Sequence, residues 1–117
     1  MSINYEGKVF GSVSNSGSGE VGNETRFHYH QQGSIVWADY SGGDIARGSL
    51  LATVDEQGRL DMRYQHVNRR GELKTGICQS TPVTLPDGRC RLLEKWTWTC
   101  GDRSSGESMI EEFPVEL

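Results

Sequence analysis

Short stretches of alternating apolar and polar residues, separated by turns that carry glycine, recur along the whole chain of 117 residues. Alternation with a period of two is typical of a strand buried on one face, and such segments at short intervals favour an all-β fold. The chain has fifteen glycines, most of them between these stretches, with tight-hairpin signals at Gly42-Gly43 and Asp87-Gly88. The pattern predicts eight strands, at residues 7–15, 24–31, 34–41, 44–54, 59–67, 72–84, 89–100 and 107–115.

An eight-stranded sheet with one apolar face must cover that face, and the sequence offers no helix for the purpose. Closing the sheet into a barrel covers the face and removes both exposed edges. We therefore expect residues 1–117 to form one domain, a single eight-stranded antiparallel up-and-down barrel with the architecture of lipocalins and streptavidin. The rival architecture is an open sheet that buries its apolar face in a homodimer. A packed barrel acting as an interaction module, dimeric through outward residues such as Leu51 and Leu93, is a further alternative.

The turns also decide how the strands align, and the alignment decides which side chains share a face. A two-residue loop at 42–43 would place Trp37 opposite Gly48, a large residue beside a small one. The longer last loop leaves open whether Glu111 or Glu112 faces inward. If Trp98 lies opposite Met109, then Trp96 lies opposite Glu111 and Glu94 opposite Phe113. The other expected inward pairs are Tyr29 with Ile35, Phe27 with Trp37, Ile35 with Leu50, Leu50 with Tyr64, Ala52 with Met62, Val54 with Leu60, Tyr64 with Thr75, Met62 with Ile77, Ile77 with Trp98 and Gln79 with Trp96.

Some polar side chains share this inner face. Glu94 lies between Leu92 and Trp96 on one face of its strand, His66 follows Tyr64 on another, and Asp39 has the same inward parity. A carboxylate in a core must be paired, hydrogen-bonded or protonated. Such groups belong either to a satisfied polar network near a barrel mouth or to a pocket in which they orient a small ligand.

The pocket interpretation defines candidate ligand-binding residues. Tryptophan and tyrosine side chains on the inner face, together with Phe27 and Tyr29, would form aromatic walls around a small, partly apolar molecule. No cofactor is expected. The alternative is an enzyme in which Glu94 or His66 acts as a general acid or base, since burial raises the pKa of a carboxylate. The candidate ligand-binding residues are Trp37, Tyr64, His66, Glu94, Trp96 and Trp98.

The charge and the residue spacing argue against other classes of protein. A formal net charge of −4 argues against binding to nucleic acid or anionic lipid. No apolar run reaches the roughly 18–20 residues of a membrane span, and the first residues lack a secretory pattern, so we expect a cytoplasmic protein with no membrane partner. The spacing of Cys78, Cys90 and Cys100 matches no zinc motif, and His28 and His30 face outward without a third ligand, so no metal site is expected.

One further motif concerns a loop. Residues 17–22, Gly-Ser-Gly-Glu-Val-Gly, match the G-x-G-x-x-G pattern of dinucleotide-binding proteins. That pattern requires a helix after it, whereas residues 25–30 alternate like a strand. We interpret the segment as a glycine-rich portal loop between the first two strands, where it could contact a ligand.

Several motifs together resemble a family of small bacterial proteins, and the similarity spans nearly the whole chain. Many members carry the label N-acetylglutamate synthase, so the resemblance implies transfer of an acetyl group from acetyl-CoA to glutamate. The motifs are Tyr40-Ser41-Gly42-Gly43, residues 63–68 (Arg-Tyr-Gln-His-Val-Asn), Pro86-Asp87-Gly88-Arg89, residues 94–99 (Glu-Lys-Trp-Thr-Trp-Thr) and residues 106–112 (Gly-Glu-Ser-Met-Ile-Glu-Glu).

Overall fold

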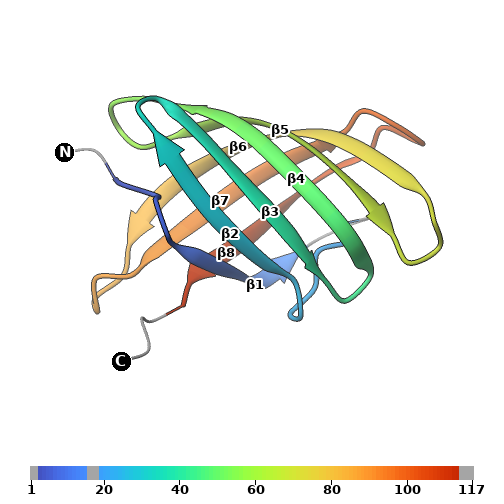
Figure 1. Ribbon diagram of the computed structural model, residues 1–117, viewed down its shortest axis with the longest axis horizontal. Coiled ribbons are helices and arrows are strands. Elements are labelled where there is room, and N and C mark those ends of the chain that lie inside the picture. Colours follow the sequence, from blue (N-terminus) through green and yellow to red (C-terminus); the bar gives the residue numbers. More distant parts are fainter. Residues whose placement is uncertain (1–2, 16–18, 114–117) are drawn as a thin grey trace.

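The structure is a computed structural model that describes residues 3–15 and 19–113. Each strand in these residues is antiparallel to the next along the chain, and β1 also pairs with β8, so the sheet closes into a barrel (Figure 1). The predicted all-β, eight-stranded antiparallel barrel is confirmed. The strands are β1 (Val9–Asn15), β2 (Arg26–Gln32), β3 (Ile35–Gly42), β4 (Ile45–Val54), β5 (Leu60–Asn68), β6 (Leu73–Thr84), β7 (Cys90–Trp98) and β8 (Ser105–Glu112). The described residues contain no helix long and apolar enough to cross a membrane.

Inside the barrel, large side chains face small ones across neighbouring strands. Tyr40 on β3 lies opposite Gly48 on β4, and Tyr64 on β5 lies opposite Gly76 on β6. A Cβ atom added at either glycine would overlap the ring of the opposing tyrosine. The two glycines therefore provide the space that the tyrosine rings fill, as expected of a close-packed interior.

One end of the barrel is closed by the segment that precedes β1. Tyr5 is completely buried, and its ring lies 5.8 Å from that of Tyr29 and 6.4 Å from that of Phe10. Its hydroxyl donates a hydrogen bond of 2.6 Å to the carbonyl of Gly58, in the turn between β4 and β5. Because Tyr5 fills this end, access to the interior is left to the opposite end, where the β1–β2 loop lies.

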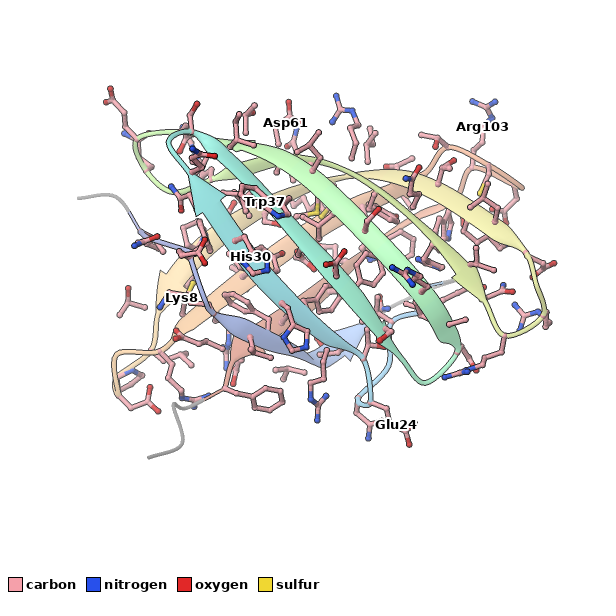
Figure 2. All side chains as sticks on the ribbon, in the orientation of Figure 1. Lys8, Glu24, His30, Trp37, Asp61 and Arg103 are labelled. Carbon is pink, nitrogen blue, oxygen red and sulfur yellow. The ribbon has the colours of Figure 1, made fainter. Side chains whose placement is uncertain are left out.

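The expected alignment of β3 with β2 is wrong by three residues, since Tyr29 lies opposite Ala38 and not Ile35. The turn before β3 uses Gly33 and Ser34, so that Gln32 pairs with Ile35. A shift by an odd number of residues reverses the faces of a strand, and Ile35, Trp37 and Asp39 consequently point outward. Trp37 lies on the outer surface, where its ring stacks on that of His30 at 5.7 Å (Figure 2). The inward residues of β3 are instead Val36, Ala38 and Tyr40.

The expected alignment of β6 is wrong by one residue, which also reverses its faces, although that of β4 with β5 is confirmed. Leu50 faces Tyr64, Ala52 faces Met62 and Val54 faces Leu60. On β6, however, the inward residues are Gly76, Cys78 and Ser80, whereas Thr75, Ile77 and Gln79 face outward. Hydrophobicity favours an inward isoleucine, but the space beside the Tyr64 ring admits only a glycine.

The structure decides the alignment of the last strand, which the sequence leaves open. Glu94 lies opposite Ser108 rather than Phe113. Glu112 shares the inward parity of Ser108, and its carboxylate accepts a hydrogen bond from the backbone N–H of Cys90. Glu111 has the outward parity and pairs with Arg91. Of the two adjacent glutamates, Glu112 is thus the inward one, at the barrel end far from the β1–β2 loop.

Candidate functional site

A cavity of about 50 Å³ lies inside the barrel beneath the β1–β2 loop. This volume holds a few water molecules. Gly19, Glu20 and Val21 of the loop cover it, and its walls come from inward side chains of the barrel strands. The walls are mostly apolar and aromatic, and a small number of polar groups converge on the space, as in ligand-binding sites.

The aromatic walls form two groups on opposite sides of the cavity. On one side, the rings of Phe27 and Tyr40 are stacked with their centroids 4.9 Å apart. On the other, Trp98 meets Tyr64 edge-on at 5.7 Å and Trp96 at 5.7 Å. Trp96 and Trp98 alternate with Glu94 along the inner face of β7, so one strand presents both a carboxylate and two indoles to the cavity.

Glu94 is the polar group of the inner wall. Its carboxylate accepts hydrogen bonds from the hydroxyls of Ser80, at 2.8 Å, and Ser108, at 3.3 Å. Among the described residues, no lysine, arginine or histidine forms an ion pair with it. Burial raises the pKa of Glu94 to about 7, and the two serine hydroxyls oppose that rise. Near neutral pH this carboxyl therefore exists in both protonation states.

At the mouth, a second carboxylate reaches into the barrel. Glu20 of the loop accepts a hydrogen bond of 2.8 Å from His66 Nε2, and a bond of 3.1 Å from the side-chain amide of Asn68. Arg70 adds an ion pair of 3.1 Å from outside. Burial acts to raise the pKa of Glu20, but the bonds from His66 and Asn68 outweigh it and leave the pKa below its ordinary value. Glu20 is thus ionised and ties the loop to the barrel.

His66 joins this carboxylate to Tyr40. Its Nδ1 lies 3.0 Å from the Tyr40 hydroxyl. Burial lowers the pKa of His66, and Glu20 only partly offsets this effect, so the ring is neutral at neutral pH. A neutral ring that donates from Nε2 to Glu20 must accept at Nδ1, so the Tyr40 hydroxyl is the donor, and it shares its single proton between His66 Nδ1 and the Gln65 carbonyl at 3.2 Å. The three side chains form a directed chain of hydrogen bonds from Tyr40 to Glu20.

The other titratable groups around Glu94 are neutral. Burial raises the pKa of Tyr29 on β2, Tyr40 on β3, Tyr64 on β5 and Cys78 on β6, and the nearby Glu94 carboxylate raises each further. None of these groups can supply a positive charge. In the described parts of the chain, no cluster of three His, Cys, Asp or Glu side chains could hold a metal ion.

The structure brings five of the expected site residues together: Tyr64, His66, Glu94, Trp96 and Trp98 all line the cavity. Trp37 does not, because its strand has the opposite parity. The expected wall residue Phe27 lines the cavity, whereas Tyr29 is buried in the core nearer to Tyr5.

Sequence reasoning missed Tyr40, Ser108 and Glu20 as lining residues. Tyr40 was missed because the expected alignment of β3 was wrong, and Ser108 because the alignment of β8 was left open. For Glu20 the signal was the glycine-rich segment itself, which predicted a loop at the portal. Nothing in that segment indicated that its glutamate would point inward.

Comparison with known proteins adds one finding. A family model described as avidin-like protein matches residues 3–113, the whole barrel with the segment that contains Tyr5. No curated protein matches the chain.

Proposed function

The chain belongs to the avidin-like family, and from this membership we propose that its barrel binds one small, partly apolar molecule. Eight-stranded barrels such as streptavidin hold a single small ligand in their interior, in that case biotin. The observation that carries the proposal is the cavity beneath the β1–β2 loop. It combines aromatic walls from Trp96, Trp98 and Tyr64 with the polar groups of Glu94 and His66.

The size of the cavity constrains the ligand. Pockets for drug-sized molecules have volumes of roughly 300–1,000 Å³, several times the 50 Å³ present here. A molecule of a few heavy atoms is accommodated with the loop in place. A ligand as large as biotin requires Glu20 and Val21 to withdraw, which breaks the hydrogen bonds from His66 and Asn68.

Two neighbouring leucines provide a matched test. Leu50 lines the cavity, whereas Leu51 is 60% exposed on the outer surface. The purified protein is examined by native mass spectrometry for a retained small molecule, and by ligand-observed NMR against a fragment library and biotin. We expect Leu50→Phe, which fills the cavity, to abolish binding, and Leu51→Phe to leave it intact. The proposal would be refuted if the protein retained no small molecule and bound no fragment, or if the two variants bound a ligand equally well.

A second candidate function, acid–base catalysis, is favoured by the hydrogen-bonded chain from Tyr40 through His66 to Glu20. A carboxylate that orients an imidazole, which in turn contacts a hydroxyl, is an arrangement that transfers protons. The test takes acetyl-CoA and glutamate as substrates and measures release of the free thiol of coenzyme A. Turnover that disappears in His66→Gln would support the enzyme, and no release would reject acetyl transfer.

We also propose that the barrel self-associates. Trp37 and Leu51 are cross-strand neighbours on the outer surface, and Ile35 lies beside them on the same face. Light scattering coupled to size-exclusion chromatography measures the mass in solution. We expect a mass above 13.0 kDa that falls to that of one chain in Leu51→Lys. A single-chain mass for the unaltered protein would refute self-association.

A further inference from the structure

The inner wall of the cavity holds one carboxylate that the barrel does not neutralise. Ser80 and Ser108 each donate one hydroxyl proton to Glu94. A carboxylate offers about four acceptor positions, so about two stay unused on a group that lines the cavity. In the described part of the chain, no cationic side chain approaches it within ion-pair distance. A buried carboxylate with spare acceptor positions is costly unless a donor or a cation meets it.

The charges at the mouth, by contrast, balance among themselves. Glu20 pairs with Arg70, which also pairs with Glu72. Lys74 adds a positive charge beside them, and it contributes to keeping the pKa of Glu20 low. His66 is neutral at neutral pH. The unbalanced negative charge therefore belongs to the interior, next to the aromatic walls.

The aromatic walls suit a positive charge. The faces of indole and phenol rings attract cations within about 6 Å of the ring centroid. This barrel already shows such a contact, since Lys74 Nζ lies 6.0 Å from the centroid of Trp98. Along β7, Glu94 and Trp96 are two residues apart, a rise of roughly 7 Å. A molecule with a cationic nitrogen and a short hydrocarbon body spans that distance.

We propose that the ligand of this cavity is a small organic ammonium ion, which places its nitrogen against Glu94 and its hydrocarbon body against Trp96 and Trp98. The inference rests on the proposed function, because it names the chemical class that the same cavity accepts. The ammonium group donates to the acceptor positions that the serines leave unused. The positive charge of the ammonium group takes the place of a cationic side chain, which the described residues do not supply next to Glu94.

The pH dependence follows from the groups that face Glu94. Tyr29, Tyr40, Tyr64 and Cys78 stay neutral below pH 9, so they do not alter the charge around the carboxylate. Two other titratable groups line the same cavity. The lowered pKa of Glu20 keeps it ionised at both pH values. His66 is neutral at pH 8.5, and a proton that it gains on acidification would repel the ammonium ion and so act in the same direction as protonation of Glu94. With a pKa of about 7, Glu94 is almost fully ionised at pH 8.5 and only about 3% ionised at pH 5.5. The ammonium ion binds the ionised form, so its affinity should fall about 30-fold between these two pH values.

The experiment compares three probes of matched shape: isobutylammonium, isobutanol and isovalerate. Binding is followed by tryptophan fluorescence in a Trp37→Phe background, which removes the indole on the outer surface and leaves Trp96 and Trp98 to report. At pH 8.5 we expect isobutylammonium to bind at least tenfold more tightly than either other probe. Glu94→Gln should lower its affinity at least tenfold and leave that of isobutanol unchanged.

Asp61→Asn is the control, because it removes an exposed carboxylate on the outer face of β5 that does not line the cavity. Equal or tighter binding of isobutanol or isovalerate would overturn the inference and leave the proposed function standing. Loss of isobutylammonium binding in Asp61→Asn but not in Glu94→Gln would also overturn it. If none of the three probes binds, the inference fails. The proposed function fails as well only if no member of the fragment library binds and biotin does not bind.

Discussion

Replacing Glu94 by glutamine should stabilise the barrel at alkaline pH and not at acidic pH. The carboxyl lines the internal cavity, accepts hydrogen bonds from the hydroxyls of Ser80 and Ser108, and has no cationic partner among the described residues. Glutamine has nearly the same shape. Its carbonyl can accept from one serine, and its amide can donate to the other, because hydroxyl groups rotate to donate or accept.

The magnitude follows from the pKa. Burial raises the pKa of Glu94 from 4.5 to about 7, so the folded protein retains a proton that the unfolded chain releases between these values. The associated stability is fully present below pH 4.5 and is lost as the pH rises through 7. At about 1.4 kcal/mol per pH unit, the free energy of unfolding should fall by about 2–3 kcal/mol between pH 5 and pH 8.5 on account of this group.

Urea unfolding followed by tryptophan fluorescence measures both proteins at pH 5 and pH 8.5. We expect Glu94→Gln to have about 2–3 kcal/mol more stability relative to the unaltered protein at pH 8.5 than at pH 5. Glu20→Gln should instead lower the stability by nearly the same amount at both pH values, because the pKa of Glu20 is lowered from 4.5 and the stability that its ionised form contributes is lost only as the pH falls below about 4.5. A stability difference for Glu94→Gln that is the same at both pH values would refute the reasoning.

Three further predictions concern packing and are checked by the same urea titrations. Tyr5→Ala should cost about 3–5 kcal/mol, because it empties the closed end of the barrel and removes the hydrogen bond to Gly58. Tyr29→Phe should leave stability unchanged or raise it by up to about 1 kcal/mol, because the buried Tyr29 hydroxyl has no hydrogen-bond partner among the described residues. Trp37→Ala should lower the free energy of unfolding by less than about 1 kcal/mol and Trp96→Ala by about 3–5 kcal/mol, because Trp96 is buried and Trp37 is not. Equal losses of stability in the two variants would contradict the faces assigned to β3 and β7.

The number and order of the strands were predictable because they depend on patterns that extend over many residues. Seven glycine-bearing connections separated eight alternating segments, and closure followed from the need to cover one face. A shift of one residue in any turn alters none of this. The barrel therefore follows from the sequence even where individual pairings were wrong.

The faces of β3 and β6 depended instead on single residues. Whether the turn after β2 uses two or three residues decides whether Trp37 or Tyr40 points inward, and residues 31–34 permit both choices. The residue that decides the matter is Gly48, which fits beside a large inward side chain on β3. The expectation that a large residue faces Gly48 was right, but the residue is Tyr40 and not Trp37. Hydrophobicity alone favours Trp37 over Tyr40 as the inward residue, and that choice is wrong.

Residues of the site were predictable where the inward face of their strand was assigned correctly, even though the expected partners of β7 on β6 were wrong. Glu94, Trp96 and Trp98 follow from parity on β7, and Tyr64 and His66 follow from parity on β5. The partner of His66 was not predictable, because Glu20 arrives from a loop, whose path no alternation rule governs. Its contact with His66 spans 46 residues of sequence.

Glu94 links the stability of the barrel to its proposed use. A loss of about 2–3 kcal/mol at pH 8.5 is a large fraction of the 5–15 kcal/mol that holds a typical domain folded. A charged residue that destabilises the fold is typical of a functional site. Replacing such a residue by a more stabilising one usually impairs function. The two Glu94→Gln measurements therefore belong together. Greater stability at pH 8.5 combined with loss of ammonium binding would tie the energetic cost to the ligand, because the ligand then supplies the cation that the barrel lacks. Greater stability with unchanged binding would make Glu94 a buried acid without a role in recognition.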